Sequence, residues 1–239
     1  MRILKDFIIN NGCFSKEENT RIFNKWFSNG PRYYFKVAAK KLNFKDKCVC
    51  DLGCAYGTNL VNLKNNSYGI EINKDMFSFV KSIGLEVYNI DFISGDISKL
   101  KKPDVIWASA ILEHIDSPHI FLRRCFNLLK DDGLICIYVP IIPFFTFLEK
   151  IPLISKFFIS YTHGDHINAF TQKTLKFFCK RAGFEIIDIG PFYPYIGSLL
   201  NLFNITGMCF CICKKINNWE YPLNSTRRKS LNVNGYEYI

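Results

Sequence analysis

A glycine loop and a downstream acid in the first half of the chain have the residue types and spacing of a nucleotide site. The loop runs from Asp51 to Gly57, and Gly53 permits a tight turn with a close backbone approach to a ligand. Glu71 follows at the end of the next predicted strand, where a carboxylate can accept both hydroxyls of a ribose. The sequence therefore predicts a pocket for a ligand that contains a nucleoside.

The spacing of the glycines separates two classes of cofactor. A dinucleotide loop carries GxGxxG, so that the pyrophosphate lies against the start of the helix. This chain has GxxxG, and the acid that precedes it would repel a pyrophosphate. The same acid suits a cofactor that bears an amino group and a sulfonium. An NAD(P)-dependent oxidoreductase or epimerase is the second hypothesis.

The elements that must position these residues follow from the alternation of short apolar runs with helical periodicity. Residues 1–46 are helical in texture and predict a cap before the sheet. Helices are also expected at 58–64, 74–83, 118–129 and 171–182, the last with Thr171 as its N-cap. Strands are expected at 47–51, 67–72, 85–90, 104–109, 134–139, 184–189 and 208–216. Strands and helices in alternation predict a parallel sheet covered on both faces.

Several motifs occur together in one order. They are Asp51-x-Gly53-x-x-x-Gly57, Gly69-Ile-Glu71, Pro103-Asp104-Val-Ile, Leu112-Glu113-His114-Ile, Leu128-Leu-Lys-Asp-Asp-Gly133 and Pro140. As a set they resemble the class I S-adenosylmethionine-dependent methyltransferases, in particular the small-molecule branch with an LEHxxDP segment after the fourth strand. The resemblance covers roughly residues 47–190. It implies a Rossmann-like three-layer sandwich with a mostly parallel seven-stranded sheet in the order 3-2-1-4-5-7-6, the last strand being antiparallel.

The resemblance also assigns the glycine loop to the amino-acid part of S-adenosylmethionine. Asp51 would face the ammonium group, directly or through a water, while Gly53, Cys54 and Gly57 form the cradle. Ala55 stands where the family usually has glycine, so the backbone would approach the cofactor slightly less closely.

The rest of the implied cofactor site comes from the ends of later strands. Glu71 would hold the ribose, and Ile72 would pack on the adenine. Asp91 would accept a hydrogen bond from the adenine amino group, with Asp96 as the competing choice. Ser109, just after the fourth strand, would lie near the methionine part of the cofactor.

Methyl transfer from a sulfonium is an in-line displacement, so the protein mainly aligns the acceptor and excludes water. A hydroxyl or amine acceptor must also lose a proton, and His114 is the candidate general base. The alternative is that Glu113 and His114 make a structural hydrogen bond or a helix cap.

Two groups of residues contain side chains that could bind a metal ion. The cysteine groups 48, 50, 54 and 209, 211, 213 lie in apolar runs with nearly period-two spacing, where cysteine acts as a small buried hydrophobe. The segment 162–166 supplies two imidazoles and a carboxylate, but a surface loop held by its own hydrogen bonds fits it as well. We therefore expect no metal site.

Composition limits the partners and the compartment. The net charge of +10 is dispersed, which argues against nucleic acid and does not determine the oligomeric state. The apolar stretch 141–161 favours a small-molecule, glycan or lipid-linked acceptor, methylated on O or N, or contact with a membrane surface. A noncatalytic membrane-surface or partner-binding protein is the third hypothesis. Ten cysteines without a secretory signal indicate the cytoplasm.

The expected domain organisation has three parts. A helical cap spans 1–46, and a methyltransferase domain spans 47–216 with an apolar insert at 141–168. A polar tail spans 217–239.

Overall fold

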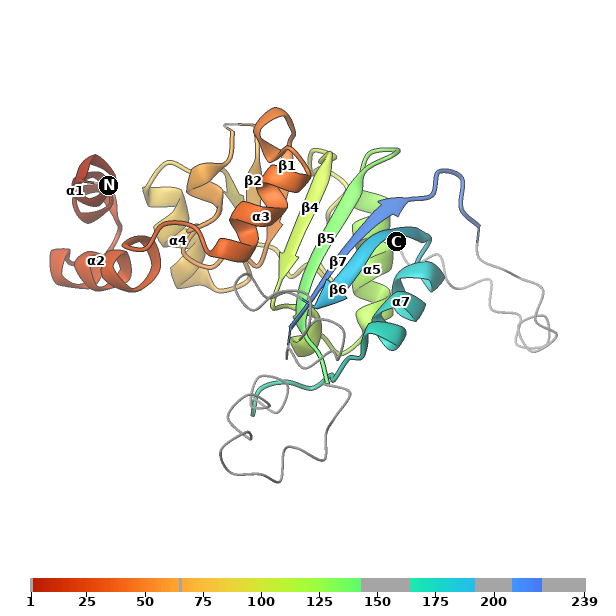
Figure 1. Ribbon diagram of the computed structural model, residues 1–239. Coiled ribbons are helices and arrows are strands. Elements are labelled where there is room, and N and C mark those ends of the chain that lie inside the picture. Colours follow the sequence, from red (N-terminus) through yellow and green to blue (C-terminus); the bar gives the residue numbers. More distant parts are fainter. Residues whose placement is uncertain (1, 65, 143–163, 192–207, 221–239) are drawn as a thin grey trace, which may run out of the picture. The chain divides into compact units, whose positions relative to one another are not determined.

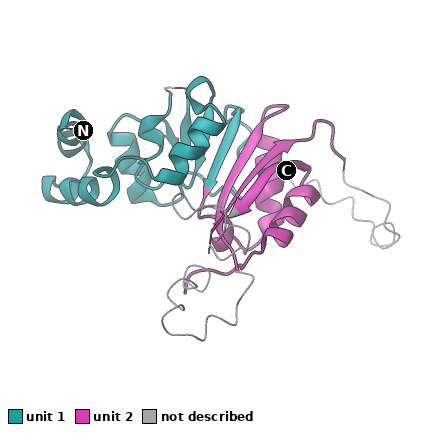
Figure 2. Ribbon diagram, in the orientation of Figure 1, with its two compact units in different colours: residues 1–108 teal, residues 109–239 magenta. Residues whose placement is uncertain are grey.

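The computed structural model describes residues 2–64, 66–142, 164–191 and 208–220. The chain forms two compact units, residues 1–108 and 109–239, which Figure 2 distinguishes by colour. The first unit contains α1 (Arg2–Asn11), α2 (Lys16–Ile22), the π-helix η1 (Phe23–Phe27), α3 (Tyr33–Lys41), the 3-10 helix η2 (Phe44–Asp46), β1 (Val49–Leu52), the 3-10 helix η3 (Leu60–Asn62), β2 (Tyr68–Ile70), α4 (Lys74–Ser82), β3 (Val87–Tyr88) and most of β4 (Val105–Ser109).

The second unit begins at the last residue of β4. Its elements are the 3-10 helix η4 (Leu112–His114), α5 (Pro118–Leu128), β5 (Leu134–Pro140), α7 (Gln172–Arg181), β6 (Phe184–Pro191) and β7 (Met208–Lys215). Thr171 is the N-cap of α7, as predicted, and forms a capping box with Thr174.

The seven strands form one sheet in the order β3-β2-β1-β4-β5-β7-β6 (Figure 1). β1 is parallel to both β2 and β4, and β2 is parallel to β3. β7 is antiparallel to both of its neighbours, β5 and β6. This order and this antiparallel last strand confirm the fold class that the sequence predicts.

The inner strands are buried because helices and loops cover the sheet. All four residues of β1 are buried, which is typical of a parallel strand with both faces covered. On β4, Trp107 is fully buried and packs against Tyr34, Phe35 and Phe44. These contacts fix α3 and η2 against the strand.

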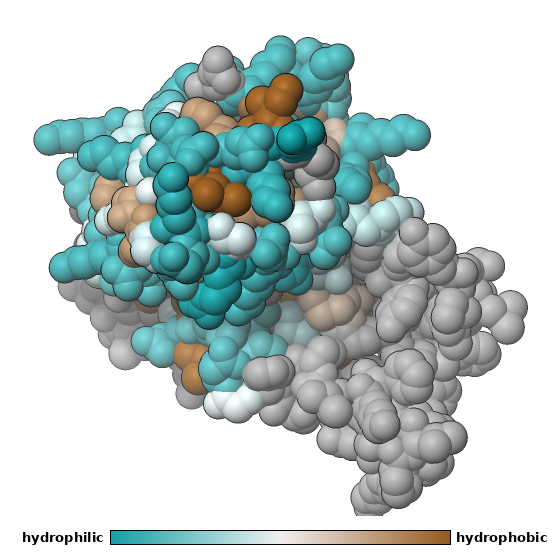
Figure 3. Space-filling view, turned by 90° about the vertical axis from the view of Figure 1, so that its left-hand side faces the viewer, coloured by the Kyte–Doolittle hydropathy of each residue, from teal (hydrophilic) through white to brown (hydrophobic). Residues whose placement is uncertain are grey.

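The N-terminal helices have a core of their own against α4. Ile8, Ile22, Phe23 and Phe27 are buried in one cluster with Phe79 of α4 and with Ile83, the C-cap residue of that helix. Residues 2–46 are therefore largely helical, as expected, and pack against the part of the molecule that follows β2. Figure 3 views the molecule from the side of α1 and α2, and this face is mostly hydrophilic with small, separate hydrophobic patches.

The predicted helix at 58–64 is wrong. The chain forms only the 3-10 turn η3 there. Asn59, Asn62 and Asn66 lie in and just after this stretch, and asparagine favours turns over helix because its side chain competes for backbone hydrogen bonds. The Nδ2 group of Asn62 donates to the Thr58 carbonyl at 2.9 Å.

The apolar stretch 141–161 lies mostly outside the described residues, and so does most of the polar tail. The start of this stretch is joined to a residue that follows its end. Ile141 forms a parallel bridge with Phe170, and the Ile142 amide donates to the Phe170 carbonyl at 2.6 Å. None of the described helices has the length and hydropathy needed to cross a bilayer.

Candidate cofactor site

The glycine loop after β1 turns through three residues with positive φ. They are Gly53 at 63°, Ala55 at 48° and Gly57 at 80°. The turn is held by backbone bonds, since the Gly53 amide donates to the Ile70 carbonyl and the Gly57 amide to the Cys54 carbonyl, both at 2.8 Å. Ala55 thus occupies the left-handed region that glycine adopts without steric cost. Alanine in place of the family's glycine at position 55 therefore affects the conformation of the backbone as well as the bulk of the side chain.

Gly69 of β2 makes room for the loop. A Cβ atom at Gly69 would lie 2.5 Å from the sulfur of Cys54 and 3.0 Å from its Cβ. Cys54 is buried, so the loop rests directly on the backbone of β2. Glycine at position 69, the first residue of the Gly69-Ile-Glu71 motif, therefore leaves the space that the Cys54 side chain occupies.

Glu71, just after β2, lies next to the loop as the sequence predicts. Its Oε2 accepts from the Ala55 amide at 2.8 Å, and its Oε1 accepts from the Asn73 amide at 2.9 Å. A carboxylate has about four lone-pair positions, so each oxygen keeps acceptor capacity for a hydroxyl. This geometry is compatible with Glu71 as a bidentate acceptor for a ribose, a role that stays a prediction.

Asp51 is a buried carboxyl group at the start of the loop. Its Oδ2 has no hydrogen-bond partner among the described residues. Burial, together with the charge of Glu71, raises the pKa of Asp51 to about 8. A buried acceptor without a donor is costly, and a ligand ammonium group would supply both the donor and the opposite charge. The unpartnered acceptor at the start of this loop therefore fits the ammonium group in the amino-acid part of S-adenosylmethionine.

The residue predicted to pack on the adenine is apolar and exposed. Ile72 is 64% exposed although it directly follows the buried strand β2. Asn89, which the sequence reasoning missed, donates from Nδ2 to the carbonyls of Glu71 and Ile72 at 2.7 and 3.0 Å. Its position two residues before Asp91, directly after β3, was the signal available in the sequence.

Asp91 and Asp96 both cap local turns. Asp91 accepts from the Ile93 amide at 2.9 Å and from the Ser94 hydroxyl at 2.6 Å, and Asp96 accepts from the Ser98 amide at 2.8 Å. The choice between them at the adenine stays a prediction. Ser109 ends β4 and is half-buried, and its role near the methionine part also stays a prediction.

A small cavity lies beside the glycine loop, where the sequence indicated none. Its volume is about 120 Å³, and it is lined by Arg21, Ile22, Lys25, Trp26, Tyr56 and Met76. The rings of Trp26 and Tyr56 are 5.6 Å apart, and the Lys25 ammonium lies 5.4 Å from the Trp26 ring. Tyr56 belongs to the glycine loop, although it was not among the predicted cofactor residues, so the N-terminal segment contacts the loop directly.

His114 lies at the end of η4 in the second unit, and its side chain is 35% exposed. Its Nδ1 is 3.1 Å from the Asp165 carbonyl oxygen, and its Nε2 is 4.0 Å from Oε1 of Glu113. Glu113 is buried, and burial raises its pKa to about 7. The distance of 4.0 Å exceeds that of a hydrogen bond between these two side chains, whereas the contact of His114 with the Asp165 carbonyl is within hydrogen-bond range. The choice between a structural role for Glu113 and His114 and a general-base role for His114 stays a prediction.

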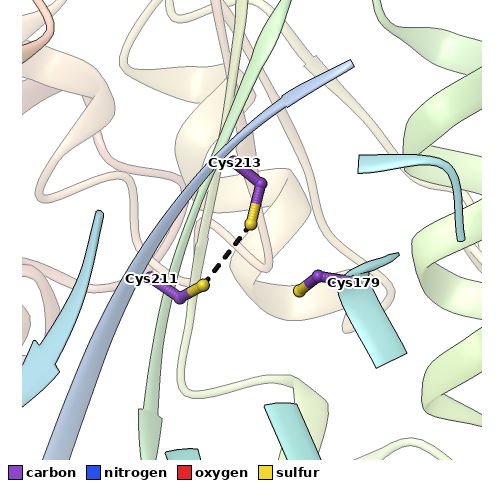
Figure 4. Close-up of side chains that lie close together, drawn as sticks. All are labelled: Cys179, Cys211 and Cys213. Atoms are coloured by element: carbon purple, nitrogen blue, oxygen red, sulfur yellow. Dashed lines mark hydrogen bonds between the residues drawn. The ribbon is translucent and has the colours of Figure 1, made fainter. Parts of the chain in front are cut away.

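The cysteines are buried apart from Cys13, and all ten are free thiols. Figure 4 shows that Cys179 of α7 points toward Cys211 and Cys213 of β7. The sulfurs of Cys211 and Cys213 are 3.4 Å apart, and all three sulfurs lie within 4.8 Å of one another. Period-two spacing predicted that Cys211 and Cys213 share a face, but not that Cys179 packs against them.

A model of a methyltransferase domain matches residues 21–189, which is more than half of the chain. The chain belongs to this methyltransferase family. Membership implies methyl transfer as the reaction of the domain and S-adenosylmethionine as its cofactor. Within the LEHxxDP segment the chain has Ser117 in place of the aspartate, and Ser117 is the N-cap of α5.

Two solved structures show the same fold. A methyltransferase of Archaeoglobus fulgidus is 22% identical with a TM-score of 0.54, over 81% of this chain and 98% of that one. A methyltransferase of Clostridium acetobutylicum is 14% identical with a TM-score of 0.55, over 83% of this chain and 98% of that one.

Two curated proteins match shorter stretches. A tabtoxin biosynthesis enzyme of Pseudomonas amygdali is 24% identical over 47% of this chain and 46% of its own length. A ubiquinone biosynthesis O-methyltransferase of Glaesserella parasuis is 44% identical over 17% of each chain. The match thus spans less than half of either curated relative.

Proposed function

We propose that this methyltransferase moves a methyl group to an oxygen or nitrogen atom of a small-molecule, glycan or lipid-linked acceptor. The observation that carries the cofactor half of the proposal is the paired geometry of Asp51 and Glu71. One is a buried carboxyl group with an unpartnered oxygen, and the other is held in place by two backbone amides. Together they suit the ammonium and the ribose hydroxyls of one ligand.

S-adenosylmethionine, when bound, supplies a methyl group on a sulfonium sulfur. The chain's own residues would hold the cofactor: Asp51 would bind the ammonium group, Glu71 the ribose, and Ile72 would cover the adenine. Because methyl transfer from a sulfonium is an in-line displacement, the main contribution of the protein would be to align the acceptor and to exclude water.

We further propose that His114 receives the proton that a hydroxyl or amine acceptor must lose. A hydrogen bond from Nδ1–H to the Asp165 carbonyl, at 3.1 Å, would fix the tautomer and leave a lone pair on Nε2. A side chain that is 35% exposed can reach an acceptor from solvent.

The acceptor class rests on composition. The dispersed net charge of +10 argues against a nucleic-acid acceptor, and the apolar stretch 141–161 favours an acceptor with an apolar part or contact with a membrane surface. Ten free thiols suit a reducing compartment, so we infer a cytoplasmic location.

Labelled S-adenosylmethionine tests the proposal most directly. Purified protein is added to a cell lysate with the methyl-labelled cofactor, and the label is then traced to the organic, polar small-molecule, protein and nucleic-acid fractions. We expect label in one of the first two fractions, and Glu71→Ala as the matched control should remove it. Label confined to protein or nucleic acid would overturn the acceptor class, and no transfer above the Glu71→Ala control would overturn the activity.

A further inference from the structure

Glu113, His114 and His166 form a group of metal-ligating side chains that the sequence alone did not bring together. One ligand atom of each lies within 4.8 Å of the others. The rings of His114 and His166 meet edge to face, with their centroids 4.8 Å apart. Glu113 and His114 belong to η4, whereas His166 belongs to a much later segment of the chain, shortly before α7.

Main-chain hydrogen bonds hold the later segment against η4. The amides of Ile167 and Asn168 both donate to the Glu113 carbonyl, at 2.9 and 3.0 Å. The side-chain amide of Asn168 donates to the Ile115 carbonyl at 2.5 Å. These bonds begin one residue after His166, so they hold its backbone next to η4.

Glu113 provides a carboxylate that needs a partner. Its side chain is 1% exposed, and Oε2 has no hydrogen-bond partner among the described residues. Burying a carboxylate oxygen without a donor or a cation is costly. A bound cation would supply the missing partner.

His114 has the hydrogen bond that orients a metal-binding imidazole. Its Nδ1 lies 3.1 Å from the Asp165 carbonyl oxygen, so Nδ1–H can donate there while Nε2 faces Glu113 at 4.0 Å. Ligating histidines usually donate their second ring N–H to a carbonyl or carboxylate in this way. The contact supports a ligand role for Nε2.

We propose that Glu113, His114 and His166 bind a divalent cation, for which Zn²⁺ is the best match. Two imidazole nitrogens and one carboxylate oxygen suit a borderline-soft ion, and three protein ligands leave a position open. Ligand atoms around Zn²⁺ are about 3.4 Å apart for bonds of about 2.1 Å, so side-chain rotations close the present spacing.

The role of the cation rests on the proposed function, although its binding does not. An acceptor hydroxyl in the open position would lose its proton more easily, because the cation stabilises the oxyanion. In that state His114 acts as a ligand, and the cation replaces it in promoting proton loss. The acceptor would then be an oxygen compound that can coordinate a metal.

Cobalt(II) is the probe, because its visible absorption reports the coordination geometry. The full chain, stripped with a chelator, is titrated with Co²⁺ and then with Zn²⁺ as competitor. We expect one equivalent of Co²⁺ with visible bands that Zn²⁺ displaces. His166→Ala should weaken binding at least about tenfold, as should Glu113→Gln, while His119→Ala on α5 serves as the control and should bind as the unaltered chain does.

Three outcomes would overturn the proposal: no saturable Co²⁺ binding, equal binding by His166→Ala, or thiolate-to-cobalt charge-transfer bands. The last would place the metal at Cys179, Cys211 and Cys213 instead. S-adenosylhomocysteine binding is measured on the same samples. If the chain binds S-adenosylhomocysteine but not cobalt, only the cation proposal fails. If the chain binds cobalt but not S-adenosylhomocysteine, only the methyl-transfer proposal fails.

Discussion

The carboxyl group of Asp51 is the side chain whose ionisation should respond most strongly to the cofactor. Its pKa is raised to about 8 by burial and by the charge of Glu71. The folded chain therefore holds a proton on Asp51 that the unfolded chain has lost above a pH of about 4. Between these values the stability contributed by the neutral carboxyl falls as pH rises, and it is lost once pH passes the folded pKa.

A ligand with an ammonium group should favour the ionised form of Asp51, so binding should release a proton. We expect the affinity for S-adenosylhomocysteine to rise with pH below 8, toward a factor of about ten per pH unit. Calorimetric titration at several pH values, in buffers of different ionisation enthalpy, measures both the affinity and the proton release.

Asp51→Asn is the control for this pH dependence. It keeps the shape of the side chain but removes the titrating group, and it should cost about 1.5–3 kcal/mol of binding, the value of a charge-assisted hydrogen bond. A pH slope that is the same in Asp51→Asn and in the unaltered chain would show that another group titrates.

Ala55 gives a second prediction, because its φ of 48° lies where glycine is favoured. Ala55→Gly should relieve about 1–2 kcal/mol of backbone strain and lose about 0.4–1 kcal/mol through the more flexible unfolded chain, for a net gain of about 0.5–1 kcal/mol. Urea unfolding measures the change. Ala39→Gly in α3, at an ordinary helical position, should instead destabilise by about 0.5–1 kcal/mol. Equal signs for the two variants would contradict this account.

Among the described helices, α7 is the one with a full capping box at its N-terminus. Thr171 accepts from the Thr174 amide, and Thr174 accepts from the Thr171 amide in return, at 3.1 and 2.9 Å. Thr171→Ala should therefore lower the free energy of unfolding by about 0.5–2 kcal/mol. Thr20→Ala in α2 is the matched control, because Thr20 lies within a helix where alanine is favoured, and it should have no cost. Chemical unfolding of both variants would detect a reversal of this order.

The elements that were predicted correctly are those with local signals. α4 begins after Asn73 and ends before Gly84, and both boundaries are typical of helix caps. Thr171 marks the start of α7 in the same way. The failure at 58–64 has a local cause too, since its asparagines form a turn instead of a helix.

The residues of the candidate site could be predicted only where they lie at the ends of neighbouring parallel strands. The pairing of β1 with β2 brings Glu71 to the glycine loop, and parallel topology fixes that neighbourhood in advance. His166 and Cys179 could not be assigned to their groups, because each meets its partners through tertiary packing between distant segments. Spacing in the sequence contains no information about such contacts.

The whole molecule offers a test between the two cofactor classes. S-adenosylhomocysteine at 100 times its Kd should stabilise the fold by about 2.7 kcal/mol. For a chain of this size that corresponds to a rise in Tm of about 5–10 °C. NAD⁺ should give no rise at the same concentration, because the loop has GxxxG and lacks the GxGxxG spacing that places a pyrophosphate at the start of the helix. A rise with NAD⁺ alone would favour an oxidoreductase.

The bridge between Ile141 and Phe170 brings together the two ends of the stretch that leads from β5 to α7. A stretch whose ends are joined can be exchanged or lengthened without changing the register of the strand before it or the start of the helix after it. If the stretch contacts the acceptor, as proposed above, exchanging it alone would change the acceptor. A chimaera that carries the corresponding stretch of another family member would keep its affinity for the cofactor while changing which acceptor it methylates.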